Sequence, residues 1–182
     1  MTLQGRTAHV TVATFMIVAA SLVGMGTAEA KTVVPAGAMI EADEATVNAV
    51  VATFERAEQA IKAHDLVTVM AVYSPQYNYH GLKKDDIRKV WKDLFDEYEE
   101  IANTHLFTKI AKVGSGSNAV LEVTCSGKLR ALSKTSGLYV PIDSWHEEVH
   151  YLVFEEGGWR IRGNVGESPR VLPFGTALHP LF

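Results

Sequence analysis

One segment of the sequence matches a known metal-dependent catalytic motif in its residue types and spacing. The segment reads His146-Glu147-Glu148-Val149-His150 and fits the pattern H-E-x-x-H. On a helix, both histidines would share a face and bind zinc, with Glu147 as the general base. The apolar run 151–154 and the glycine pair 157–158 favour a strand instead, in which the histidines would lie about 13 Å apart. We therefore expect no metal site here.

The strand interpretation groups the same residues differently. Alternate side chains of a strand share a face, so His146, Glu148 and His150 would lie together. A carboxylate beside an imidazole can orient the ring and shift its pKa, which gives an acid–base pair near neutral pH. These three residues are the candidate catalytic residues. The alternative is a solvated outer face of the sheet.

Aromatic side chains with polar tips form a second candidate group, for binding rather than catalysis. Tyr77 and Tyr79 precede the most strongly amphipathic segment of the chain, and Trp91 and Phe95 lie within it. Such rings line small-molecule pockets, so these four are candidate ligand-binding residues. The alternative is that they pack in the core and at its rim.

The elements that must position these residues change from helices to strands along the chain. Apolar residues recur at steps of three and four after Asp43, the expected N-cap of a helix that should end near His64-Asp65, and again over 87–101. A shorter helix is expected over 66–73 and ends before Pro75. A twofold alternation then predicts strands over 105–113, 119–131, 144–156 and 159–165. Helices followed by an antiparallel sheet are typical of an α+β fold.

The two ends of the chain differ from the domain between them. Residues 1–30 combine an uncharged apolar run with Ala28 and Ala30 at the positions of an A-x-A cleavage site, the layout of a secretory signal peptide. We expect an exported protein, periplasmic or secreted, without stable membrane insertion after cleavage. Residues 31–42 are expected to be a flexible lead-in. Residues 166–182 are rich in proline and large apolar residues, so this tail is expected to lie along the domain or a partner subunit, the alternative being a disordered end.

Composition argues against several kinds of partner and site. The 182 residues carry a net charge of −4 with a pI near 6.0, so neither nucleic-acid binding nor membrane adsorption through basic residues is expected. Cys125 is the only cysteine, which rules out an internal disulfide, and we expect it to be a small buried apolar residue. Length and hydrophobic content fit one domain with its own core.

The order of elements and a few local sequences resemble nuclear transport factor 2-like domains, which include SnoaL-like and ketosteroid isomerase-like proteins. The more specific part is the closing hairpin over 151–161, Y-L-V-F-E-E-G-G-W-R-I. Tyr73-Ser74-Pro75, then Gly81, then the aromatic helix match the same pattern. The resemblance spans 46–163, within a domain placed at 43–165. It implies a curved antiparallel sheet wrapped around a long helix, the cystatin-like cone fold, with a conical pocket and often a homodimer.

Fold alone does not decide the function, because this group contains isomerases, dehydratases and cyclases as well as pocket proteins without catalysis. No motif fixes the acidic base or the oxyanion donor that the isomerase-like members need, so no catalytic residue is carried over. Our leading hypothesis is an exported protein that binds a small, partly apolar ligand, as a homodimer and without a cofactor. The alternatives are an isomerase, dehydratase or cyclase that uses His146, Glu148 or His150 as acid or base, and a non-catalytic interaction module.

Overall fold

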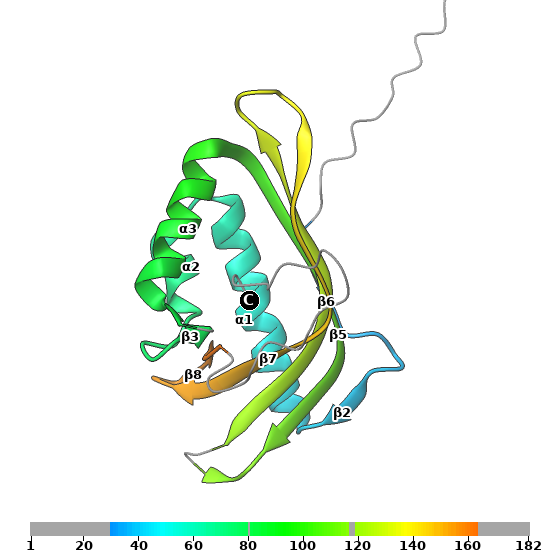
Figure 1. The fold of residues 1–182 in the computed structure, drawn as a ribbon. Coiled ribbons are helices and arrows are strands. Elements are labelled where there is room, and N and C mark those ends of the chain that lie inside the picture. The colour runs from blue at the N-terminus through cyan, green and yellow to red at the C-terminus, as the bar shows by residue number, and fades with distance from the viewer. Residues whose placement is uncertain (1–29, 80, 117–118, 164–182) are drawn as a thin grey trace, which may run out of the picture.

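The computed structural model describes residues 30–79, 81–116 and 119–163. Figure 1 shows a strongly curled sheet with the helices α1, α2 and α3 packed against its concave side. This is the predicted α+β architecture, with helices on a curved sheet. The expected signal peptide, apart from Ala30, and the expected apolar tail over 166–182 lie outside the described residues.

The large sheet has the strand order β1-β5-β6-β7-β8, and β2 also pairs with β5. Its long strands are antiparallel neighbours: β5 Tyr98–Val113, β6 Val120–Ser133, β7 Tyr139–Glu155 and β8 Gly158–Ile161. The segment 31–42, expected to be a flexible lead-in, instead supplies β1 Lys31–Val33 and β2 Met39–Glu41, both parallel to β5. The outer edge of β5 offers backbone groups that these short strands pair with. A separate hairpin, β3 Asn78–Tyr79 and β4 Leu82–Lys83, leads into α3.

Helix α1, Glu44–Lys62, lies in the concavity of the sheet. Asp43 caps it as predicted, because its carboxylate accepts hydrogen bonds from the backbone N–H and the hydroxyl of Thr46, at 2.8 and 2.9 Å. The buried positions follow the helical period and include Val50, Phe54, Ala57 and Ile61. The shorter helix α2, Leu66–Ala71, is capped in the same manner by Asp65.

Helix α3, Lys84–Glu97, ends earlier than the sequence predicts. The chain becomes extended at Tyr98, so Ile101, expected on the helical stripe, lies in β5 instead. Lys134 donates hydrogen bonds from Nζ to the carbonyls of Phe95 and Asp96, at 2.9 and 2.7 Å. These carbonyls would otherwise be unsatisfied at a helix C-terminus. The boundary is therefore stabilised by a tertiary contact.

β-Bulges interrupt the pairing of the long strands at neighbouring positions. The register shifts between Phe107 and Lys109 in β5, and between Cys125 and Gly127 in β6. A bulge bends its strand and increases the local twist. The bulges therefore help the sheet to curl around α1, as seen in Figure 1.

The core lies between the helices and the concave face. Trp91 of α3 is fully buried, and its indole Nε1 donates a 2.8 Å hydrogen bond to the hydroxyl of Tyr73. Phe54 packs edge to face against Phe107 of β5, with ring centroids 4.9 Å apart. Cys125 is fully buried, as predicted, and burial raises the pKa of its thiol to about 12. It is therefore protonated at neutral pH and unsuited to act as a nucleophile.

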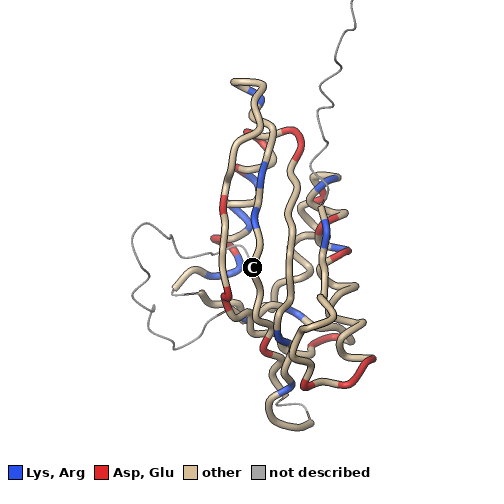
Figure 2. Tube along the Cα trace, turned by 90° about the vertical axis from the view of Figure 1, so that its right-hand side faces the viewer, with Lys and Arg blue, Asp and Glu red and all other residues tan. Residues whose placement is uncertain are grey.

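Basic and acidic residues are interleaved along the helices and strands, as Figure 2 shows. Two of the ion pairs tie β5 to the chain before α1: Lys109 to Glu41 and Lys112 to Asp43, each at 3.8 Å. Their side chains are partly exposed, so each pair contributes little to stability. Within the described segments, no helix is both long and apolar enough to cross a membrane.

Glu58 is a carboxyl group of α1 that is only 4% exposed and accepts a 2.6 Å hydrogen bond from the hydroxyl of Thr32 in β1. Burial raises its pKa from 4.5 to about 6, and the hydrogen bond opposes this only in part. The folded protein thus holds this proton more tightly than the unfolded chain. The stabilising contribution is fully present below pH 4.5 and is lost as the pH rises through 6.

We expect the free energy of unfolding of the wild type, relative to Glu58→Gln, to fall by about 1–2 kcal/mol from pH 4.5 to pH 7.5. Urea unfolding at both pH values measures this difference. Glu44→Gln removes the same charge from an exposed position at the start of the same helix and is the matched control with which the pH dependence is compared. A difference for Glu58→Gln that does not vary with pH would contradict the raised pKa.

Candidate functional site

The H-E-x-x-H segment lies in strand β7, and a β-bulge divides it. Two residues of β7, His146 and Glu147, oppose the single residue Ser126 of β6. Glu147 adopts a left-handed backbone conformation with φ 53°, which is uncommon for a residue other than glycine. The extra residue reverses the alternation, so Glu148 and His150 lie on the concave face while His146 is exposed on the convex face.

The prediction that His146, Glu148 and His150 share one face is therefore wrong for His146. Assigning alternate residues to one face assumes that the pairing of the two strands has no bulge. One extra residue in a strand moves the side chains that follow it to the opposite face. The two histidines of the motif lie on opposite faces of the strand. They cannot share a metal ion through bonds of about 2.1 Å.

His146 and Glu147 belong to a polar cluster on the convex face. The backbone N–H of Glu147 donates to Oγ of Ser126 at 2.9 Å, and the hydroxyl of Thr108 donates to Oε1 of Glu147 at 3.1 Å. Oγ of Ser126 also lies 3.2 Å from Nδ1 of His146. The carboxylate of Glu147 contacts the hydroxyls of Thr108 and Ser126 and not the imidazole of His146. The three residues Ser126, His146 and Glu147 therefore do not have the arrangement of a serine–histidine–acid triad. The contacts satisfy polar groups that the bulge releases from the ladder.

Asn103, His105, Glu148 and His150 form a polar group on the concave face, named here the concave cluster. Nδ2 of Asn103 lies 2.7 Å from Nε2 of His105. Phe54 of α1 packs edge to face against His105, with centroids 5.0 Å apart, and is tilted against His150 at 6.3 Å. Strands β5 and β7 supply the cluster, and α1 covers part of it.

The ring of His105 is held from both of its nitrogens. Opposite the Asn103 contact, Nδ1 of His105 lies 3.6 Å from Sγ of Cys125. That sulfur accepts a hydrogen bond from Nε1 of Trp145 at 3.2 Å. The ring of Trp145 also lies against His105, with centroids 5.2 Å apart. These contacts fix the orientation of the imidazole.

Asn103 is fully buried, yet its side-chain oxygen has no hydrogen-bond partner among the described residues. If the amide is turned over, the oxygen meets His105 and the nitrogen loses its partner instead. A buried polar atom without a partner costs about 1–3 kcal/mol. Such atoms in native proteins call for a specific partner such as a bound molecule or water.

Glu148 is the half-buried member of the concave cluster. Burial, and secondly the negative charge of Asp143, raise the pKa of its carboxyl group to about 7. Both protonation states are then populated near neutral pH, so the group can accept or release a proton. Of the predicted catalytic candidates, the fold brings Glu148 and His150 to one face and places His146 elsewhere.

Asn103 and His105 are site residues that the sequence patterns did not reveal. A signal for His105 exists, because it alternates with Phe107 along the predicted strand over 105–113 and so occupies an inward position. Asn103 offers no comparable signal, since it lies between the predicted helix over 87–101 and the predicted strand over 105–113.

The four aromatic residues predicted to bind a ligand, Tyr77, Tyr79, Trp91 and Phe95, are all buried. They belong to the same hydrophobic core, where Phe95 stacks on His64 with centroids 4.7 Å apart. Burial raises the pKa of the Tyr77 hydroxyl, which stays protonated. These positions fit the alternative of core packing, and a role in ligand binding stays a prediction.

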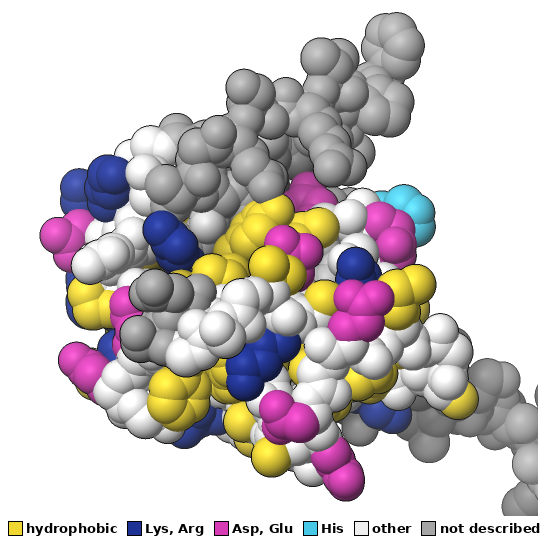
Figure 3. All heavy atoms as spheres, turned by 90° about the horizontal axis from the view of Figure 1, so that it is seen from below, with side chains coloured by type: hydrophobic (Ala, Val, Ile, Leu, Met, Phe, Trp, Pro, Cys, Tyr) yellow, Lys and Arg dark blue, Asp and Glu magenta, His cyan; other side chains and the backbone are white. Residues whose placement is uncertain are grey.

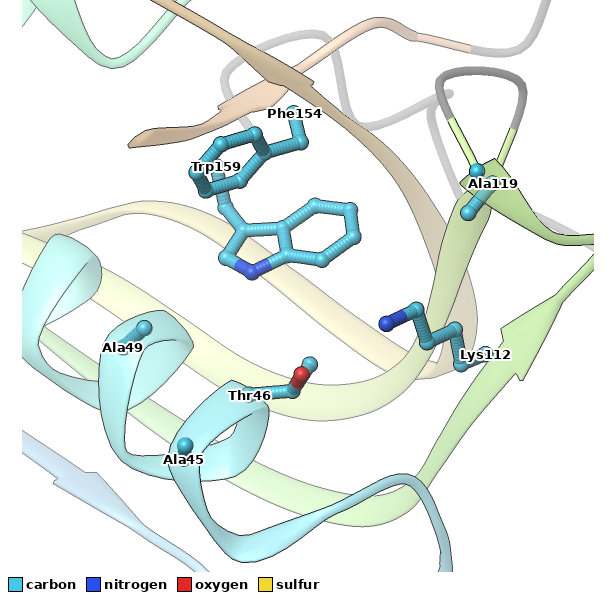
Figure 4. Close-up of a pocket in the computed structure, with 8 residues that line it drawn as sticks. Ala45, Thr46, Ala49, Lys112, Ala119, Phe154 and Trp159 are labelled. Atoms are coloured by element: carbon cyan, nitrogen blue, oxygen red, sulfur yellow. The ribbon is translucent and has the colours of Figure 1, made fainter. Parts of the chain in front are cut away.

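A pocket of about 330 Å³ lies at the end of the cone where α1 begins, and is named here the end pocket. Its lining consists of Ala45, Thr46, Ala49, Lys112, Gly116, Ala119, Phe154 and Trp159. Phe154 and Trp159 meet edge to face, with ring centroids 5.4 Å apart. Figure 4 shows the ammonium group of Lys112 directed into the space between α1 and Trp159.

Comparison with known proteins gives similarity in structure only. No protein-family model matches the sequence, and no curated protein matches it. A conserved protein from Planctomyces limnophilus is 12% identical with a TM-score of 0.56, over 66% of this chain and 94% of that one. A candidate aromatic ring hydroxylase from Novosphingobium aromaticivorans is 15% identical with a TM-score of 0.54, over 68% and 88%. A candidate dehydratase from the NTF2-like family, from Streptomyces avermitilis, is 11% identical with a TM-score of 0.48, over 67% and 95%.

These similarities concern the fold and not the chemistry. The helices on a curled sheet, together with the alignments to the first two structures, agree with the resemblance noted in the closing hairpin. The chain has the nuclear transport factor 2-like fold. At such low sequence identity, the activities of the neighbours do not transfer.

Proposed function

We propose that this nuclear transport factor 2-like domain is an exported pocket protein that binds a small, partly apolar molecule at the concave cluster. The observation that carries the proposal is the fully buried amide of Asn103, which has an unpartnered atom and contacts His105, the ring on which Phe54 packs. A ligand hydroxyl could donate a hydrogen bond to the Asn103 oxygen, or, with the amide turned over, a ligand carbonyl could accept one from its nitrogen. The apolar part of the ligand would contact rings such as Phe54. Glu148, on the same face, would donate or accept a second hydrogen bond according to its protonation.

Export is part of the proposal and rests on the sequence of residues 1–30. Cleavage after Ala30 would release the chain at Lys31, the first residue of β1. The hydrogen bond from Thr32 to Glu58 would then be kept, so the processed chain loses no contact that joins β1 to α1.

Native mass spectrometry of the full-length chain, expressed with export, tests the proposal. The denatured mass reports cleavage, and the native mass reports the proposed homodimer and any retained organic molecule. Asn103→Leu keeps the size of the side chain but removes its amide, and we expect it to abolish retention. Asn48→Leu, at an exposed position of α1, is the matched control and should retain the molecule. The proposal fails if no mass is retained and no small ketone or phenol shifts the NMR signals of the Asn103 amide.

Proton-transfer catalysis is the second candidate function, and the near-neutral pKa of Glu148 favours it. In this case Glu148 would remove or deliver a proton at the polar end of the bound molecule, with His105 or His150 on the same face as a second polar group. An isomerisation or dehydration requires such a step. Glu148→Gln would then abolish turnover while leaving binding intact, whereas a binding protein has no turnover to lose.

The titration of Glu148 is a direct test of this second candidate. We expect its side-chain carboxyl carbon to titrate in NMR spectra with a midpoint of about 7. Asp143→Asn should lower the midpoint, because it removes a negative charge, but should leave it above 4.5, because burial is the larger cause. A wild-type midpoint at the ordinary value of 4.5 would exclude Glu148 as an acid–base group near neutral pH.

A further inference from the structure

The end pocket lies away from the concave cluster, where α1 begins and β5 ends. Seen from this end of the molecule in Figure 3, apolar side chains are exposed between charged ones. Phe154 is 57% exposed, an unusual exposure for a phenylalanine. The volume of the end pocket, about 330 Å³, lies in the range of small-molecule sites. Its chemistry therefore calls for a separate explanation.

Most of the side chains that line the end pocket are apolar. Small side chains of α1, Ala45 and Ala49, face the rings of Phe154 and Trp159, and Ala119 completes the wall from the β6 side (Figure 4). Small residues opposite aromatic rings leave a slot in which a planar apolar group can lie. The pocket thus fits a ligand with a flat, ring-like body.

Two hydrogen-bond donors face this slot. Trp159 is only 6% exposed, and its indole N–H donates no hydrogen bond within the described part of the chain. Figure 4 shows the indole nitrogen on the ring edge that faces α1, and the Lys112 ammonium reaching into the same space. Lys112 lies 3.8 Å from Asp43, beyond hydrogen-bond distance, so its donors are still available.

The charges around the slot favour an anion. Lys112 is a cation, and the first turn of α1, with Ala45 and Thr46, brings the positive end of the helix dipole to the same wall. Asp43 is the opposing charge, but its carboxylate already accepts two hydrogen bonds from Thr46. An acceptor that enters the slot therefore meets donors on Lys112 and Trp159.

We propose that the end pocket binds a small aromatic carboxylate, with its ring between α1 and the Phe154–Trp159 pair and its carboxylate at Lys112 and the Trp159 indole N–H. A carboxylate accepts two such hydrogen bonds at once, and charge-assisted bonds are the strong ones. The site is independent of the concave cluster, so this proposal and the proposed function stand or fall separately.

Titration of the full mature chain with sodium phenylacetate, followed by 1H–15N NMR, tests the proposal. The chain has 3 tryptophans, and we expect the indole N–H signal of Trp159 to shift in a saturable manner while those of Trp91 and Trp145 stay in place. Phenylacetamide has the same ring without the charge, and should bind about tenfold more weakly or worse.

Lys112→Met keeps most of the apolar stem but removes the charge, and should weaken phenylacetate binding by about tenfold or more. Lys109→Met is the matched control, since Lys109 has the same 37% side-chain exposure and the same 3.8 Å ion-pair distance but lies on the opposite face of β5. It should stay within about twofold of the wild type. Trp159→Phe, which keeps a ring but removes the N–H, should also weaken binding.

Four outcomes would overturn the proposal. The acid and the amide could bind equally well, Lys112→Met could bind as the wild type does, or millimolar phenylacetate could leave the Trp159 signal unmoved. A shift confined to Trp145 would also overturn it, because that residue contacts the concave cluster. Thermal unfolding of each variant shows whether a loss of binding reflects a loss of fold.

Discussion

Gly127→Ala is expected to destabilise the protein by about 3 kcal/mol or more, because the added methyl group has no space. A Cβ atom at this position would lie 2.1 Å from the backbone oxygen of Thr104 and 2.4 Å from Cζ2 of Trp145. The oxygen belongs to the neighbouring strand β5, so it cannot yield without disturbing the ladder. Trp145 is buried and cannot swing into solvent.

The effect should reach the concave cluster as well as the stability. Trp145 donates a hydrogen bond to Cys125 and lies against His105, so a displaced indole would release the imidazole. Urea unfolding measures the stability, and the near-ultraviolet circular dichroism of the tryptophans reports the displaced ring.

Gly158→Ala is the matched control for this experiment. A Cβ atom there would meet nothing within 4 Å, and the backbone of Gly158 does not require glycine. Its stability should stay within about 1 kcal/mol of the wild type. A loss of stability for Gly127→Ala as small as that of this control would contradict the close contact between Trp145 and Gly127.

Phe54→Ala is expected to cost about 3–5 kcal/mol in unfolding free energy, the usual range for a large buried ring. Phe54 is 1% exposed and lies where α1 meets the sheet. Its ring packs edge to face on His105 and on Phe107, with centroids 5.0 and 4.9 Å away. Removal would leave a cavity beside the concave cluster that the rigid sheet cannot close.

Phe154→Ala removes the same ring from an exposed position, which makes it the comparison for Phe54→Ala. It should cost about 1 kcal/mol, the contribution of its edge-to-face contact with Trp159. Denaturant midpoints of the two variants give the contrast directly. Equal losses would show that α1 does not pack on the concave face through Phe54.

The two proposed sites differ in their chemistry. The concave cluster places polar groups on an inner face, where burial raises the pKa of Glu148 and leaves an atom of Asn103 unpartnered. The end pocket places a cation and an indole N–H at the margin of the same face, against small helix residues. We therefore propose different ligands for them, a neutral polar molecule at the concave cluster and an anion at the end pocket.

The sequence by itself determined the three helices and the four strands that follow them, β5 to β8, in their order. The steps of three and four over 43–62 predicted α1, and Asp43 was correctly identified as its cap. The apolar run after His150 correctly indicated a strand. The H-E-x-x-H segment therefore does not have the helical context in which that motif binds zinc. These features are local, because helix and strand periods and caps depend on residues within a few positions of one another.

Only the tertiary structure decided where α3 ends and which side chains meet. Helix α3 ends at Glu97, where Lys134 donates hydrogen bonds to the last carbonyl groups. Strand β1 pairs with the outer edge of β5, which is distant in sequence. Likewise, the end pocket joins Thr46 to Lys112 and Trp159, residues that are distant in sequence.

The assignment of His146, Glu148 and His150 to faces shows the physical reason most clearly. Ser126 of the facing strand accepts the N–H of Glu147 and so stabilises the bulge, and no pattern within β7 records that contact. A single extra residue then reverses the faces, so His146 lies outside and His150 inside. Periodicity is a property of one strand, whereas register is a property of two.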